Sequence, residues 1–234
     1  MAKGANCLNK KSQRIFAGIL AILISIAMIG SGIIGVFFSG DASPSRTGGT
    51  QTANAEAEYQ AQKLRLDAMA QKAKTDPENV LLQTALGNEY YNAGIAAQTV
   101  APAEMAENFR KAIGPYQIVL KTNKDPNIMV DMATSAFYSG DYDLAEKSFN
   151  EALVIKSDFI NALINYGIFL SQAKQDWAGA LNQWQKALPL SQNSSDKEQI
   201  QAMINQAQSE LKTNPAANGS NQNPNPALNN TTGK

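Results

Sequence analysis

Residues 133–167, ATSAFYSGDYDLAEKSFNEALVIKSDFINALINYG, decide the fold of this chain. The stretch begins and ends on a small residue, Ala133 and Gly167. Apolar side chains recur within it at spacings of three and four, the period of a helix with one buried face. Gly140-Asp141 interrupts that pattern, as a turn between two helices does. The stretch therefore predicts a helix, a turn and a second helix, after which a similar unit begins.

The same pattern occurs three times along the chain. The first helix of each unit carries a small residue, at Gly87, Ala133 and Gly167. The second helix repeats the order small, aromatic, small, in Ala112-x3-Tyr116-x2-Val119, Ala145-x3-Phe149-x2-Ala152 and Ala180-x3-Trp184-x2-Ala187. Small residues let the partner helix approach closely, and the aromatic rings fill the space between successive pairs. The chain is therefore predicted to be a stack of helix pairs.

This pattern resembles the tetratricopeptide repeat, a helix-turn-helix unit whose copies stack into an α-α superhelix. The step from Ala133 to Gly167 equals the length of that unit. The helical domain is expected at residues 55–212, with repeats at about 76–125, 126–159 and 160–192 and a capping helix at 195–212. No run of alternating β-branched residues appears, so the expected fold class is all-α.

The first repeat departs from the regular spacing. About a dozen extra residues lie around 94–103, and they predict either a loop or a helix extension. Pro115 falls inside the second helix of this unit and is expected to kink it. Two caps are also expected: Asp143 for the second helix of the middle unit, and Ser195, with Glu198 three positions later, for the last helix.

Residues 15–38 form an apolar stretch without a charged side chain. As a helix the stretch would span roughly 36 Å, more than the ~30 Å hydrocarbon core of a bilayer, so it is predicted to be a single transmembrane helix. The four basic residues before it place residues 1–14 in the cytoplasm and the helical domain on the extracytoplasmic side of the cell membrane. A signal peptide cleaved near Ala42 is the competing interpretation, although a signal core is normally only ~7 to 15 residues long.

Two segments are expected to lack a fixed structure. Residues 39–54 are rich in Gly, Ser and Thr and are predicted to be a flexible linker. Residues 213–234 are rich in Asn and Pro, contain one large apolar residue, and are predicted to be disordered. Small residues spaced four apart within 15–38 leave open a dimer formed through the membrane helix.

The composition argues against an enzyme. The chain has no His and one Cys, Cys7, so it lacks the commonest general base and metal ligand, and no catalytic residue, cofactor or metal site is predicted. Four of the 20 basic side chains lie before residue 15, which leaves 16 basic against 20 acidic side chains in residues 41–234. This balance argues against binding nucleic acid.

The family resemblance implies a concave groove that binds a peptide or a helix from a partner protein. The groove is expected to be polar, uncharged and partly aromatic, and to be lined by Asn88, Tyr91, Asn92, Thr134, Phe137, Tyr138, Asn161, Asn165 and Ile168. A subgroup of the family grips C-terminal carboxylates with Lys and Arg in this groove. Here Thr84, Asp131, Asn161 and Asn165 stand at positions of that clamp, so a free C-terminus is not the expected ligand.

These features predict a membrane-anchored, non-enzymatic adaptor or scaffold for protein partners. Two alternatives remain open: a self-associating structural component of an envelope assembly, and a secreted binding protein released by signal cleavage.

Overall fold

The computed structural model describes residues 48–213, and within them it contains helices and no strand. The α-helices are α2 (Gly48–Thr75), α3 (Val80–Val100), α4 (Met105–Thr122), α5 (Pro126–Ser139), α6 (Tyr142–Ile155), α7 (Ile160–Ala173), α8 (Trp177–Ala187) and α9 (Ser194–Thr213). The chain divides into two compact units after Gln60, and the packing described below belongs to the second unit. The expected all-α class is confirmed for the described residues.

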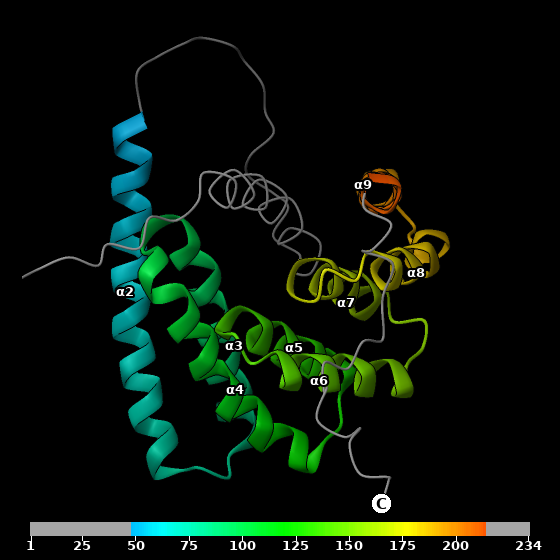
Figure 1. Ribbon diagram of the computed structural model, residues 1–234. Coiled ribbons are helices and arrows are strands. Elements are labelled where there is room, and N and C mark those ends of the chain that lie inside the picture. The colour runs from blue at the N-terminus through cyan, green and yellow to red at the C-terminus, as the bar shows by residue number, and fades with distance from the viewer. Residues whose placement is uncertain (1–47, 214–234) are drawn as a thin grey trace, which may run out of the picture. The chain divides into compact units, whose positions relative to one another are not determined.

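Helices α3 to α8 form three successive pairs. Each helix packs against the next one along the chain, and the first helices α5 and α7 of neighbouring pairs also meet. Figure 1 shows α5 next to both α4 and α6, and α9 following α8. Helices α5 and α7 begin at Pro126 and Ile160, the same step that separates Ala133 from Gly167 in the sequence.

Small residues on the first helices face large rings on the second helices. A Cβ atom on Gly87 would lie 2.6 Å from Cε1 of Tyr116, and one on Gly167 would lie 2.7 Å from Cε2 of Trp184. Such distances leave no room for a methyl group. The indole of Trp184 is also held in place, since its Nε1 donates a hydrogen bond of 3.1 Å to the carbonyl of Ile164. The glycines therefore set how closely these helices approach.

The helix ends explain the positions of the turns around α5. Asp125 caps this helix by accepting a hydrogen bond from the backbone N–H of Asn127, and Pro126 takes the first helical position. Gly140 ends the helix with φ of 90°, a left-handed conformation that favours glycine. Helix α5 is therefore bounded at both ends by residues whose conformation its sequence dictates.

Two predicted caps are each wrong by two positions. The cap of α6 is Asp141, whose carboxylate accepts from the N–H of Leu144, whereas Asp143 lies in the first turn. The cap of α9 is Asn193, whose Oδ1 accepts from the N–H of Asp196 at 2.7 Å, so the Ser195 capping box does not form. Several Ser, Asp and Asn residues lie within one turn of each helix start, and the upstream turn decides which of them caps.

The extra residues of the first unit form a helix extension. Helix α3 continues to Val100, and a single 3₁₀ turn (η1, Pro102–Glu104) connects it to α4. Helix α4 in turn continues through Pro115, which offers no N–H to the preceding turn.

Residues 48–54, expected to belong to the linker, form the first turns of α2. These residues include two Gly and two Thr, which are poor helix formers, so the earlier start extends a helix that is already nucleated further along the chain. The predictions for residues 1–14, for the membrane helix at 15–38, for the linker up to residue 47 and for the tail from residue 214 lie outside the described residues. Among helices α2 to α9, none combines the length and the hydropathy of a membrane span.

Candidate functional site

The nine expected groove residues differ in how much of them is accessible. Asn88 and Asn92 on α3 are exposed, and the side chains with intermediate exposure are Tyr91, Phe137, Tyr138, Asn161 and Asn165. Thr134 and Ile168 are buried, at 7% and 4% exposed. These two therefore do not present their side chains to a ligand.

The aromatic members of this set belong to a connected group of rings, here called the aromatic array. Its rings come from α3, α4, α5, α6 and α7, and they are Tyr91, Phe109, Phe137, Tyr138, Tyr142, Phe149, Tyr166 and Phe169. The ring of Phe109 packs edge-on against Tyr91 with centroids 5.5 Å apart and stacks on Tyr138 at 4.9 Å. Each ring shares at least one contact with another, so the array links all three helix pairs.

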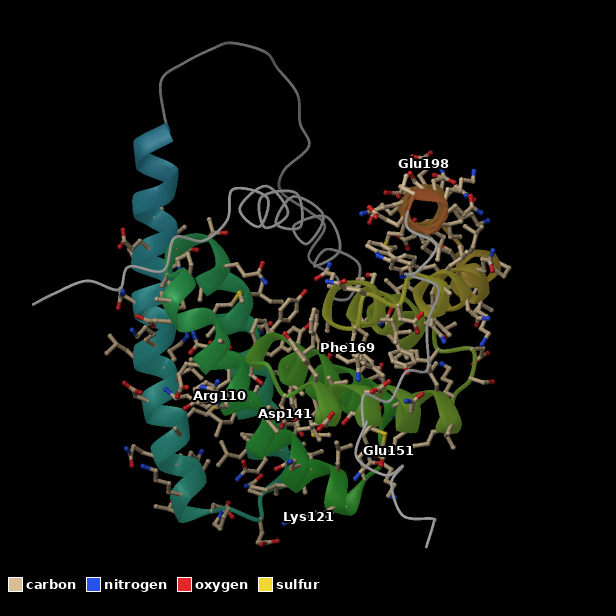
Figure 2. All side chains as sticks on the ribbon, viewed as in Figure 1. Arg110, Lys121, Asp141, Glu151, Phe169 and Glu198 are labelled. Carbon is tan, nitrogen blue, oxygen red and sulfur yellow. The ribbon has the colours of Figure 1, made fainter. Side chains whose placement is uncertain are left out.

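Phe169 on α7, labelled in Figure 2, is the centre of the second half of the array. Its ring is fully buried. It contacts Phe137 at 5.6 Å, Phe149 at 6.0 Å, and Tyr142 and Tyr166 at 6.2 Å each. Phe137 thus contributes to the packing between α5 and α7, in addition to any contact that it makes with a ligand.

Polar groups from three helices meet around Asp131, and we call Tyr91, Tyr116, Asp131, Thr134 and Tyr138 the Asp131 cluster. Asp131, Thr134 and Tyr138 follow one another at spacings of three and four on α5 and therefore share one face of that helix. The negative charge of Asp131 acts on the hydroxyls of both Tyr91 from α3 and Tyr116 from α4. The hydroxyl of Tyr116 donates a hydrogen bond of 3.0 Å to Oδ1 of Asn88, which places Asn88 at the exposed edge of the cluster.

Burial controls the protonation of this cluster. Burial of the carboxyl, and then the negative charge of Asp125, raise the pKa of Asp131 to about 7 from an ordinary 3.8. Burial also raises the pKa of Tyr91, Tyr116 and Tyr138, so the three phenols stay neutral near pH 7. No Lys or Arg among the described residues forms an ion pair with Asp131. The carboxyl of Asp131 therefore has no cationic partner among the described residues.

The stability of the chain is expected to fall as the pH rises through this acid's titration. Because the pKa of Asp131 is higher in the folded than in the unfolded chain, the folded chain binds more protons between about pH 4 and pH 7. Asp131→Asn should therefore raise the free energy of unfolding at pH 8 by about 1–3 kcal/mol and change it little at about pH 4. The full shift would correspond to roughly 4 kcal/mol, which residual contact with water reduces.

Urea unfolding of the full chain in a maltoside detergent measures this difference. Trp177 and Trp184 are the two tryptophans of the chain and lie together on α8, so their emission reports unfolding of the stack. Asp158→Asn, at an exposed acid before α7, is the matched control and should leave the pH dependence unchanged. An Asp131→Asn variant that follows the parent at every pH would show that the carboxyl is fully solvated.

Asp131 can exchange a proton near neutral pH, whereas burial leaves the neighbouring phenols too weakly acidic to do so. Within residues 48–213, no three side chains that could ligate a metal come together.

Three residues of the site were missed by the sequence prediction. Tyr116 and Phe109 belong to α4 and fill the core, and they also contact the cluster and the array. Asp131 enters the sequence analysis only because it stands where the carboxylate clamp requires a different residue. The signal for Asp131 was present in the sequence, since an acid two helical turns before Tyr138 shares its helical face.

Comparison with family models gives no match to this chain, and comparison with curated proteins gives none either.

Proposed function

We propose that this chain is a membrane-anchored scaffold of the tetratricopeptide type that binds a segment of another protein, without catalysing a reaction, on the extracytoplasmic side. The observation that carries the proposal is the accessible polar and aromatic surface on α3 and α5. Asn88 and Asn92 are exposed, and Tyr91 and Tyr138 are partly exposed although they are joined to the buried array.

Such a surface matches what binding sites for peptides require. Large rings held by neighbouring rings lose little entropy when a ligand contacts them, and amide side chains can pair with the main chain of an extended segment. Asn161 and Asn165 continue the amide row onto α7, where both are partly exposed. The membrane attachment and the side of the membrane are supported by the uncharged residues 15–38 and the basic residues before them.

Photo-crosslinking in the native membrane tests the binding role. A benzophenone amino acid at Asn92 should capture a distinct protein, whereas the same probe at Val154, an 85% exposed residue on α6, should not. A product that is only a second copy of this chain would favour the self-associating alternative. Equal capture from both positions, or none from Asn92, would remove the support for a site on α3.

Cysteine labelling tests the side of the membrane. In a Cys7→Ser background, Glu151→Cys places a thiol on an exposed position of α6, also labelled in Figure 2. A membrane-impermeant maleimide should label it in intact cells. Labelling only after permeabilisation would place the helical domain in the cytoplasm, and an intact mass that lacks the residues before Ala42 would favour the secreted alternative.

A further inference from the structure

The carboxyl of Asp131 is an acid of the second unit that is placed beside rings and not beside a described cation. It is partly buried against α3 and α4, yet no described side chain donates a hydrogen bond to it and none of the described ion pairs includes it. Other acids with restricted exposure have partners: Glu146 pairs with Lys174 at 2.9 Å, and Glu104 pairs with Lys63 at 2.8 Å. A partly buried carboxylate without a cation is costly unless something outside the chain supplies one.

The groups around this carboxyl are those that accompany a bound cation. The Tyr91, Phe109 and Tyr138 rings are fixed relative to one another by contacts of 5.5 and 4.9 Å, and Tyr116 approaches from α4. Aromatic faces attract cations, more strongly where water is excluded. The Asn88 amide oxygen at the exposed edge adds a hydrogen-bond acceptor, and it already accepts from Tyr116. The cluster thus combines an anion, rings and an acceptor, and no described ion pair brings a cation to it.

We propose that the Asp131 cluster binds the guanidinium group of an arginine side chain from the partner protein. Arginine fits better than lysine because its planar guanidinium stacks on aromatic rings, is more weakly hydrated, and offers several donors to a carboxylate and a neighbouring acceptor. The inference rests on the proposed function in one respect: a protein partner supplies the arginine. The partner would therefore present a basic residue to α3 and α5, the opposite of a C-terminal carboxylate.

The protonation of the site fits this role. The pKa of Asp131, raised to about 7 by burial and by Asp125, shows that the charged form lacks compensation in the free chain. Its charge acts on Tyr91 from α3 and Tyr116 from α4, while Tyr138 shares its face of α5, and burial raises the pKa of all three phenols. Among these groups only Asp131 and Asp125 can thus contribute negative charge, and a bound guanidinium would favour ionised Asp131.

Binding of N-acetyl-arginine amide to the full chain in maltoside micelles tests the inference. With 4-fluorophenylalanine incorporated, the fluorine resonance of Phe109 lies between the two tyrosine rings, and a Phe109→Leu variant identifies it. The resonance should shift saturably with a dissociation constant in the millimolar range. N-acetyl-citrulline amide, nearly the same shape without the charge, should cause no saturable shift. Binding at pH 6 should be roughly tenfold weaker than at pH 8, because at pH 6 the carboxyl of Asp131 is protonated in most molecules.

The variants separate charge from folding. Asp131→Asn should weaken arginine binding at least tenfold although the variant is expected to be the more stable protein, so a loss of binding cannot be attributed to unfolding. Asp158→Asn should bind as the parent does. Equal shifts with arginine and citrulline, unchanged binding by Asp131→Asn, or no shift at all would overturn the inference. Crosslinking of a partner at Asn92 does not depend on this assay, so the proposed function can fail or succeed separately.

Discussion

Replacing Phe169 by alanine is expected to lower the free energy of unfolding by about 3–5 kcal/mol. The side chain is fully buried and contacts four other rings, from α5, α6 and α7. Its removal therefore takes away a large apolar surface and leaves a cavity bounded by rigid rings that cannot all collapse into it. Urea unfolding of the full chain in detergent, followed by the emission of Trp177 and Trp184, measures the loss.

Tyr142→Ala is the matched control for this experiment. Tyr142 contacts two rings of the same group, Phe137 and Phe169, but it is 44% exposed and lies at the start of α6. Its truncation should cost roughly 1 kcal/mol or less, because it leaves no enclosed cavity. Equal losses for the two variants would mean that Phe169 is not at the centre of the aromatic array.

Gly167→Trp is expected to prevent the third helix pair from forming. The first atom of any side chain at this position would overlap Nε1 of the Trp184 ring and lie 2.7 Å from its Cε2, and that ring is fixed by its hydrogen bond to Ile164. Adding a few methylene groups to a packed core costs about 1–3 kcal/mol, and a whole indole exceeds that range. The measurements are the tryptophan emission maximum and the resistance of residues 160–187 to limited proteolysis.

The same substitution at Gly114 provides the control. Gly114 is exposed on α4, and a Cβ atom built there would meet nothing within 4 Å. Gly114→Trp should therefore fold, because it replaces a poor helix former in an open position. If residues 160–187 resist proteolysis in Gly167→Trp as well as they do in Gly114→Trp, then α7 and α8 do not cross at Gly167.

The helical class could be predicted from the sequence because packing between paired helices leaves a periodic trace. Gly87 and Tyr116 lie on different helices, yet each is where the repeat pattern requires a small or a large residue, and they do meet. The turn at Gly140 was readable for a similar reason, since a left-handed end of a helix restricts the residue type. Features that steric exclusion enforces could therefore be predicted from the sequence.

Features that depend on small energy differences could not be predicted from the sequence. Asp141 rather than Asp143, and Asn193 rather than Ser195, cap their helices, and each choice separates residues of similar capping strength. The exposure of the groove residues also depends on which side chains surround them in the folded chain, and Ile168 and Thr134 are buried there. The uncompensated charge of Asp131 required knowing which Lys and Arg side chains reach it, and a one-dimensional pattern does not contain that information.

The aromatic array couples ligand binding at the first helix pair to the stability of the third. In a stack of helix pairs, each pair is stabilised mainly by its immediate neighbours. Here rings in contact cross from α3 and α4 through α5 to α7. A ligand bound to Tyr91 would oppose the separation of Tyr91 from Phe109, and the contacts of Tyr138 and Phe137 carry that constraint to Phe169. An occupied first pair would therefore make the third pair more resistant to local opening.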